Sequence, residues 1–355
     1  MKTQWFWQAG ALAVAMLAAL GCSRESDRAP TSSSSSAGSG DVVVYTSVDD
    51  VFARPICEKF QRETGIKVQL VPDTEETKST GLLNRLIAEK ARPRCDLFWS
   101  GDPIRAAILK AKGVSAAYRS PQAAGLPKLY SEPEGHWTGF SCRARVIIYN
   151  RELVPEGQEP KSVLDLQDAR FKDKACLANP LFGTTSMHAA ALFAKLGDDE
   201  AQKFFRDFAA NGGKILSSNG EVRRRVAAGE FAVGLTDTDD YNVARLEGKP
   251  VGVVYPDADG MGTVVVPNCA VLIAGGPNPD NGRRFIDYLL TPEVEQALAE
   301  SEAAQMPVRS GVSVPAHVVT LDQLKAMEID YERLGARLES LTKGFLKEWV
   351  DENSR

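Results

Sequence analysis

Three carboxylates stand close together in the segment 234–241, whose sequence is GLTDTDDY. The apolar run 231–233 before it predicts a buried strand, and open α/β sheets bind ligands where the chain leaves such strands. Like charges a few ångströms apart raise one another's pKa, so Asp237, Asp239 and Asp240 favour a metal ion or an amine beside them. The alternative interpretation is a solvated acidic loop in which Asp239 or Asp240 caps the next helix.

A second polar segment, 179–186 with the sequence NPLFGTTS, joins a predicted strand to a predicted helix. Thr184 or Thr185 can cap this helix. Exposed backbone N–H groups at a helix start, flanked by hydroxyls and preceded by glycine, are typical of an anion site; a plain N-cap is the alternative. The Gly-Lys-Thr signature of nucleotide-binding loops and the G-x-S-x-G signature of a nucleophile elbow are absent from the sequence.

These segments need a scaffold, and the first part of the chain alternates apolar runs with helical patterns, which indicates a parallel sheet flanked by helices. Asp102 and Pro103 are typical of a helix start. The acidic turns at 47–49 and 100–102 follow strand ends and should open on the same edge of the sheet. The predicted strands of this part are 42–45, 66–71 and 95–99.

The segment 140–145 is interpreted as a crossing into a second α/β alternation, and 263–268 as the return crossing. We therefore predict an α/β fold of two lobes, each a mostly parallel sheet flanked by helices, joined by two crossing strands that act as a hinge. The predicted lobes are residues 41–141 with 270–355, and residues 142–269. The tail is predicted to be helical, with Leu334, Leu338, Leu341, Phe345 and Trp349 on one face.

The N-terminus carries a lysine, a short apolar run at 9–20 and small residues before Cys22. Such a pattern is typical of a secretory signal, and a cysteine directly after a small residue is typical of a bacterial lipoprotein. We interpret residues 1–21 as a signal peptide, Cys22 as the lipidation site and the serine-rich residues 22–40 as a flexible tether. This predicts a protein in the periplasm or at the cell surface, held at the membrane by its lipid.

The formal net charge of −5 and the ordinary apolar content argue against a nucleic-acid partner. No C-x-x-C pair occurs, which argues against a thiolate zinc site. His136 and His188 lack a partner at i+4 and are interpreted as structural. At most two disulfides can form among the cysteines after Cys22, and their pairing is left open. These cysteines are Cys57, Cys95, Cys142, Cys176 and Cys269.

Several separate segments occur in the order that one protein family shows. They are VYTSVD at 44–49, DLFWS at 96–100, residues 140–150, residues 179–186, GEFAVG at 229–234 and VPN at 266–268. With these segments the chain resembles the ferric-iron-type solute-binding proteins of bacterial ABC importers over nearly all of the sequence after the tether. The resemblance implies a periplasmic-binding-protein-like fold of type II. It also implies a binding protein, not an enzyme, that closes on a small charged solute and delivers it to a permease in the cytoplasmic membrane.

In the iron-binding members of this family a histidine, a glutamate and a tyrosine pair hold the metal, and an anion bound at a helix start completes the shell. By order along the chain, the resemblance implies that Asp49 occupies the position of the family's histidine and that Gly101 or Asp102 is near the position of its glutamate. Asp239 and Asp240 occupy the positions of its tyrosine pair. The implied metal ligands are Asp49, Asp239, Asp240 and Tyr241, the last one residue late. The implied ligand-binding residues are Ser47, Asp49, Trp99, Ser100, Asp102, Thr184, Thr185, Ser186, Asn219, Asp237 and Thr238.

The cargo stays open between a metal and an organic solute. Carboxylate oxygens suit iron(III), with phosphate or carbonate as the accompanying anion, and also suit another hard ion such as calcium. An aminophosphonate would place its anion at 184–186 and its amine at Asp49, Asp239 or Asp240. Trp99 would pack against the ligand or be buried in its strand. No cofactor is required, and we expect a monomer.

The competing class is a secreted hydrolase that uses Asp237, Asp239 and Asp240 as acid and base. The carboxylate pairs of glycoside hydrolases lie across a cleft and not in one turn. This spacing therefore favours binding over hydrolysis.

Overall fold

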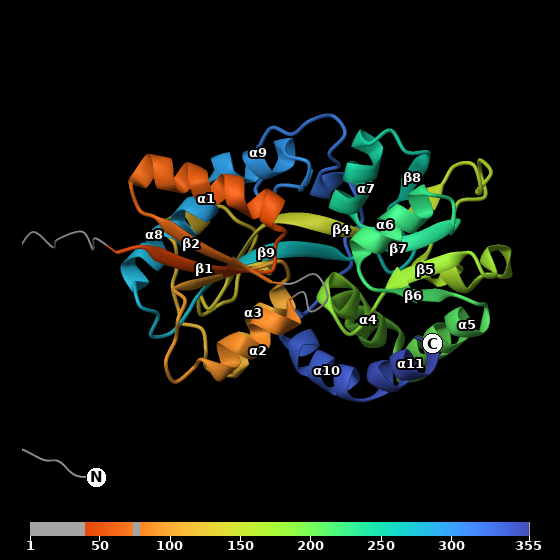
Figure 1. The fold of residues 1–355 in the computed structure, drawn as a ribbon, viewed down its shortest axis with the longest axis horizontal. Helices are drawn as coiled ribbons and strands as arrows, with labels where there is room; N and C mark the ends of the chain where they lie inside the picture. The colour runs from red at the N-terminus through yellow and green to blue at the C-terminus, as the bar shows by residue number, and fades with distance from the viewer. Residues whose placement is uncertain (1–39, 74–78, 355) are drawn as a thin grey trace, which may run out of the picture. The chain divides into compact units, whose positions relative to one another are not determined.

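The computed structural model describes residues 40–73 and 79–354, so the predicted signal peptide, Cys22 and all but the last residue of the predicted tether lie outside the described residues. The described residues belong to one unit, Gly38–Arg355. Its strands follow the order β2-β1-β3-β9-β4-β7-β5-β6, and β8 pairs with β4 (Figure 1).

The first half of the fold is built on three parallel strands, as the alternation in the sequence predicted. Their inward side chains, among them Val42 and Val44, are buried. Gly65, at φ 71°, ends the first helix, and the side chain of Asp102 accepts a hydrogen bond from the N–H of Arg105 to cap the third. The elements of this half are β1 (Val42–Thr46), α1 (Asp50–Thr64), β2 (Val68–Pro72), α2 (Thr80–Ala88), β3 (Leu97–Ser100), α3 (Pro103–Ala111), α8 (Pro279–Leu289) and α9 (Pro292–Glu300).

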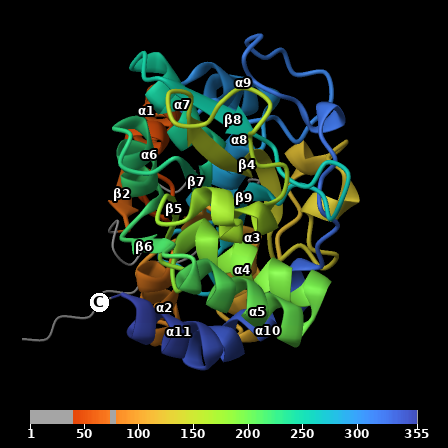
Figure 2. The same cartoon turned by 90° about the vertical axis from the view of Figure 1, so that its right-hand side faces the viewer.

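The second half repeats this design. Strands β5, β6 and β7 are parallel, and β8 adds an antiparallel edge beside β4. Helices α6 and α7 cover one face of this sheet, and α4 and α5 cover the other (Figure 2). The elements are β5 (Ala175–Ala178), α4 (Gly183–Leu196), α5 (Asp198–Ala210), β6 (Lys214–Leu216), α6 (Asn219–Ala227), β7 (Val233–Asp237), α7 (Thr238–Leu246) and β8 (Val251–Val254). Short 3-10 helices lie at Pro121–Ala123, Lys128–Tyr130, Val163–Gln167, Ala169–Phe171 and Leu321–Gln323.

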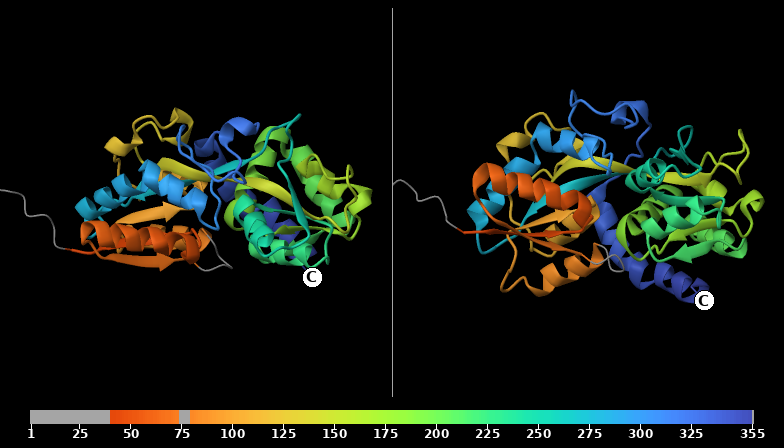
Figure 3. Two further views of the ribbon diagram at one scale, coloured as in Figure 1. Left: turned by 90° about the horizontal axis from the view of Figure 1, so that it is seen from above. Right: turned by 45° about the horizontal axis from the view of Figure 1, so that its top comes forward.

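Two long strands, β4 (Thr138–Asn150) and β9 (Val265–Leu272), belong to both halves (Figures 1 and 3). Strand β4 pairs first with β9 and then, from Arg145 onward, with β7. A bulge interrupts β4 at Ser141, whose φ is 30° and whose N–H donates to the Glu295 carboxylate at 2.8 Å. These two strands are the crossings that the sequence predicted.

The C-terminal helices α10 (Tyr331–Lys343) and α11 (Phe345–Asn353) contact both halves, although the sequence assigned residues 270–355 to the first lobe. Helix α10 packs on α3 and α4, and α11 packs on α5. The indole of Trp349 lies 5.1 Å from the ring of Phe205 and donates to the carbonyl of Phe205. The apolar face of the tail therefore finds its partner aromatic side chains on the second half.

The predicted bounds of one strand were wrong by a few residues. Strand β7 starts at Val233 and includes Thr236 and Asp237, so part of the predicted loop is strand. Gly234 lets β7 pack closely on α6, because a Cβ there would lie 2.5 Å from a methyl group of Val222.

The predicted N-caps also differ from the structure. The N-cap position of α7 is Asp237 and not Asp239 or Asp240. That of α4 is Phe182, so Thr184 and Thr185 lie inside its first turn.

The five cysteines from Cys57 to Cys269 are all free thiols and all buried. The sequence left their disulfide pairing open, and in the structure no disulfide joins any two of these five residues. Among the described helices, none combines the length and the apolar character that crossing a membrane requires.

Candidate functional site

A cavity of about 60 Å³ lies where strand ends and helix starts from both halves meet. This volume holds a few water molecules or one small solute. The first half contributes Ser47, Asp49 and Ser79, and β4 contributes Arg143. The second half contributes Ala178, Asn179, Phe182, Gly183, Thr184, Thr185, Ser217, Ser218, Asn219, Gly220, Asp237, Asp239 and Asp240.

Arg145 is a fully buried arginine that organises one wall of the cavity. Its guanidinium donates to the Asp237 carboxylate at 2.6 Å and to the hydroxyls of Thr184 and Thr185 at 3.0 and 3.1 Å. Asn219 accepts from the same group at 3.2 Å. The hydroxyl of Thr184 in turn donates to Asp237 at 2.7 Å. Because every member has several partners, the start of α4 is fixed against the end of β7.

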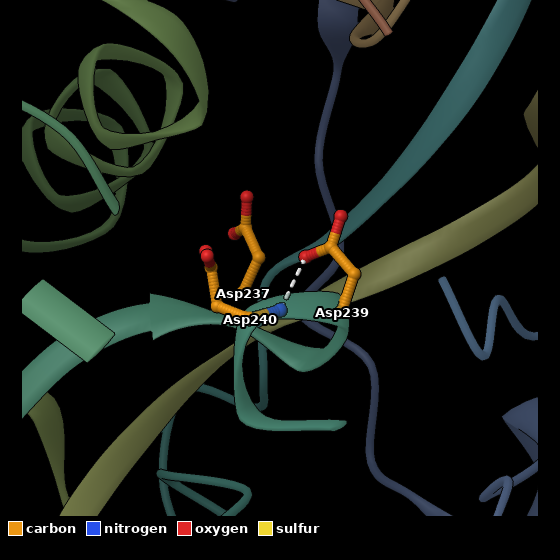
Figure 4. A group of neighbouring side chains, drawn as sticks. All are labelled: Asp237, Asp239 and Asp240. Carbon is orange, nitrogen blue, oxygen red and sulfur yellow. Dashed lines mark hydrogen bonds between the residues drawn. The ribbon is translucent and has the colours of Figure 1, made fainter. Parts of the chain in front are cut away.

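Three carboxylates, those of Asp237, Asp239 and Asp240, place one oxygen each within 4.8 Å of one another (Figure 4). Burial, followed by the charges of Asp239 and Asp237, raises the pKa of Asp240 to about 8. Burial alone would also raise the pKa of Asp237, but Arg145 and Arg143 together hold it below its ordinary value. The cluster therefore keeps a proton at neutral pH that a cation would displace.

Arg143 lines the same cavity from β4. It donates to the carbonyl of Gly101 in the first half at 2.6 Å and lies 3.5 Å from Asp239. Burial opposes its charge, but the surrounding carboxylates, Asp239 first, raise the pKa of Arg143 above its ordinary value. The guanidinium is thus permanently charged and joins the two halves beside the acidic cluster.

Helix starts supply further positive potential. Of the described helices, five begin at the wall of this cavity: α1, α2, α4, α6 and α7. Four of them, all but α6, have no side-chain hydrogen bond at the N-cap. A helix start carries about half a positive charge and free N–H donors. The start of α4, which has no carboxylate in its first turn, therefore suits an anion. At the starts of α1 and α7 the carboxylates of Asp49, Asp239 and Asp240 offset this potential, and that wall suits a cation.

The structure does not bring all of the predicted residues to the cavity. Trp99 is fully buried and packs against Phe140, with 5.7 Å between the rings, because it belongs to the apolar layer under α1. Tyr241 packs beside the apolar cluster of Val222 and Val251 and does not line the cavity.

The other predicted site residues that do not line the cavity form hydrogen bonds elsewhere. The Ser100 hydroxyl donates to the carbonyl of Asp102, and Asp102 caps α3. The Ser186 hydroxyl accepts from Arg105, and that of Thr238 accepts from the N–H of Ala144. These four residues thus position elements around the cavity without lining it.

Sequence reasoning missed both arginines. Arg143 and Arg145 lie at i and i+2 in the apolar crossing segment, so the period of a strand places them on one face. Charged residues in a strand that is otherwise buried are the signal that could have found them. His188, interpreted as structural, is buried one turn after Thr184, and burial followed by the nearby Arg145 charge lowers its pKa to about 3.

The family model for bacterial extracellular solute-binding proteins matches residues 96–333 of the chain. The chain therefore belongs to this family, and its relatives place it with the ferric-iron-type solute-binding proteins of ABC importers, as the resemblance implied. The family consists of periplasmic binding proteins and not of enzymes.

Two relatives and one solved structure show the range of the family. Iron uptake protein A1 of Synechocystis is 27% identical over 297 residues, which cover 80% of each chain. A periplasmic protein of Salmonella typhimurium, whose name proposes 2-aminoethylphosphonate as its ligand, is 29% identical over 268 residues, which cover 72% of this chain and 74% of that one. The iron-bound HitA structure from Pseudomonas aeruginosa has a TM-score of 0.77 at 22% identity and covers 86% of this chain and 98% of that one. The type II fold is thereby confirmed.

Proposed function

We propose that this solute-binding protein captures a small solute that carries an anionic group and an amine, of the aminoalkyl phosphonate class. The observation that carries the proposal is the pairing of two unlike walls in one cavity. Gly183, Thr184 and Thr185 begin an α4 that has no side-chain cap, and Asp239 and Asp240 face the same space. A phosphonate at α4 and an ammonium at the carboxylates satisfy both walls at once.

The relative named for 2-aminoethylphosphonate supports this class of solute. So does the position of Tyr241, because the phenol that the iron-binding pattern requires packs away from the cavity. The arginines add a further argument. A trivalent ion bound to a carboxylate that Arg145 already holds would lie within about 5 Å of a guanidinium. At an effective dielectric constant of 20, each unit of its charge would be opposed by about 3 kcal/mol.

Iron(III) with an accompanying anion is the second candidate, and one observation favours it. The oxygens of Asp237, Asp239 and Asp240 lie within 4.8 Å of one another, which is close enough to converge on one hard ion. The iron uptake relative supports the same cargo.

We further propose where the protein acts and how it is held there. The signal pattern before Cys22 supports a lipid anchor at a periplasmic or cell-surface location, from which the protein would deliver its solute to a permease. We propose that the protein has no hydrolytic activity, because Asp237, Asp239 and Asp240 lie together at the end of β7 and the start of α7 beside two arginines. We also propose that it acts as a monomer.

Calorimetric titration with 2-aminoethylphosphonate, ethylphosphonate, ethanolamine and ferric citrate tests the ligand. The proposal expects the bifunctional compound to bind at least tenfold more tightly than either fragment. It expects Asp240→Asn to remove most of that difference while leaving ethylphosphonate binding unchanged. Asp259→Asn, an exposed carboxylate outside the cavity, is the matched control. Tight binding of ferric citrate with no response to the amine would replace the first candidate with the second.

A further inference from the structure

Arg105 connects the two halves directly at the start of α4. It belongs to α3 in the first half and is 1% exposed. Its guanidinium donates to the carbonyl of Gly183 at 3.3 Å and to the hydroxyl of Ser186 at 2.7 Å, both in the first turn of α4. It also donates to the hydroxyl of Thr80 in α2 at 3.3 Å. One side chain therefore holds three helix starts together.

The acidic partner of Arg105 is close but does not take up its donors. Asp102 lies 3.5 Å from the guanidinium, and its other oxygen caps α3. Within the described residues, one oxygen of Asp102 and the Nε of Arg105 have no hydrogen-bond partner. A buried ion pair is weak support for stability as such, since desolvation of the charges offsets their attraction. The charge and the forked donors are instead directed at α4, where Gly183 lines the cavity.

Three predicted site residues that do not line the cavity are explained by this connection. Ser100 donates to the Asp102 carbonyl, Asp102 fixes the start of α3, and Ser186 accepts from Arg105. They form one hydrogen-bonded path from the end of β3 to the first turn of α4. The path ends at the wall to which the proposed function assigns the anionic group.

We propose that Arg105 is a positioning residue for the anion wall: it holds the first turn of α4 against the first half and adds positive potential behind the exposed N–H groups. Binding of an anion at α4 is thereby coupled to contact between the halves, because both depend on the same turn. This role rests on the proposed function for its ligand, but the fixed position of α4 can be tested without any ligand.

Hydrogen exchange on the full-length protein without ligand gives the first test. Arg105→Met keeps the volume and removes the charge and the donors. It is expected to speed exchange of the hydrogen-bonded α4 amides that begin at Ser186, whose N–H donates to the carbonyl of Phe182, at least tenfold, with no change in α5. Lys110→Met removes a charge from the same helix, where Lys110 pairs with Glu132 and not with α4, and is expected to leave α4 unchanged. Exchange at α4 that is the same in Arg105→Met and wild type overturns the inference.

Ser186→Ala provides a milder variant should Arg105→Met fold poorly. It removes one acceptor and leaves the arginine in place, so a smaller increase in exchange at the same turn is expected. In the double variant the two effects are expected to be less than additive, because both remove the same contact. Full additivity would mean that Arg105 and Ser186 act independently and would count against the proposed path.

Binding separates positioning from general stability. Inorganic phosphate and ethanolamine serve as probes of the two walls. Arg105→Met is expected to weaken phosphate about ten- to a hundredfold with ethanolamine within about twofold of wild type, and Arg105→Lys is expected to recover only part of the loss, because lysine lacks the fork. Equal loss of both probes would indicate a merely structural role and overturn the inference. A wild-type protein that binds neither these probes nor 2-aminoethylphosphonate would refute the proposed function, while the exchange experiment would still decide the role of Arg105.

Discussion

Asp240 offers the sharpest test of how this cavity recognises charge. Burial and the neighbouring carboxylates raise its pKa to about 8, so at neutral pH the isolated site holds a proton there. A bound amine or metal ion needs the ionised carboxylate, and its binding must therefore release this proton. A bound anion would instead retain the proton as a hydrogen-bond donor. The sign of the pH dependence thus reports which end of the ligand faces Asp240.

The magnitude follows from the pKa. At pH 6, about two pH units below the pKa, about 1% of Asp240 is ionised. The affinity for a cation should therefore be about a hundredfold weaker than above pH 8, or about 2.7 kcal/mol at 1.36 kcal/mol per unit. Between these limits affinity should rise up to tenfold per pH unit. In Asp240→Asn this contribution disappears.

The assay is calorimetric titration with 2-aminoethylphosphonate at pH 6, 7, 8 and 9 in two buffers of different ionisation enthalpy, which counts released protons. The phosphonate of the probe titrates as well, but its contribution is common to wild type, Asp240→Asn and the control Asp259→Asn. The difference between wild type and Asp240→Asn isolates the carboxyl group. Equal slopes in these two proteins would refute the reasoning, and a slope of opposite sign would place the anion at Asp240.

The ligand-free protein tests the same shift independently. Because the folded pKa of Asp240 lies above its unfolded value of about 3.8, the folded state keeps a proton that the unfolded chain has lost, and stability falls as pH rises from about 4 to 8. Asp240→Asn should flatten this decline in a series of thermal melts. A decline of unchanged steepness in the variant would show that another group causes it.

Three further outcomes follow from the packing. Gly234→Ala should destabilise by more than about 1 kcal/mol in urea unfolding, since its Cβ would meet the Val222 methyl at 2.5 Å; unchanged stability would show that β7 can shift. Ser141→Gly should keep or raise the melting temperature, with a gain in stability of up to about 1 kcal/mol, because Ser141 has φ 30°. The control Ala144→Gly, in the regular part of β4, should lose about 1 kcal/mol of stability. A loss of stability in both variants would refute strain at the bulge. Asp237→Asn should cost about 3–5 kcal/mol, because it leaves a buried guanidinium without its anionic partner, and a loss below about 1 kcal/mol in urea unfolding would show that water reaches the pair.

The local sequence pattern was enough to predict the strands and helices of the scaffold, because these elements depend on residues near one another in the chain. The apolar runs and caps around Val42, Gly65 and Asp102 predicted the parallel strands and helix ends of the first half, and the composition of the crossings predicted two strands shared by both halves. Strand β7 extends through Asp237, beyond the predicted apolar run, because Thr236 and Asp237 pair with Val146 and Arg145 of β4. A pairing between segments so far apart in the chain leaves no local signal.

The lining of the candidate site was predicted in part. Hydroxyls and carboxylates after strand ends indicated that Thr184, Thr185 and the aspartates of 237–240 are neighbours in space, and these residues line one cavity. Their role in binding stays a prediction. The sequence by itself determined the family and which edge of each sheet carries polar chemistry. Only the tertiary structure decided that Arg143 and Arg145 partner the carboxylates, because burial of a charge and the identity of its partner depend on segments that lie far apart in the chain and meet only in the fold.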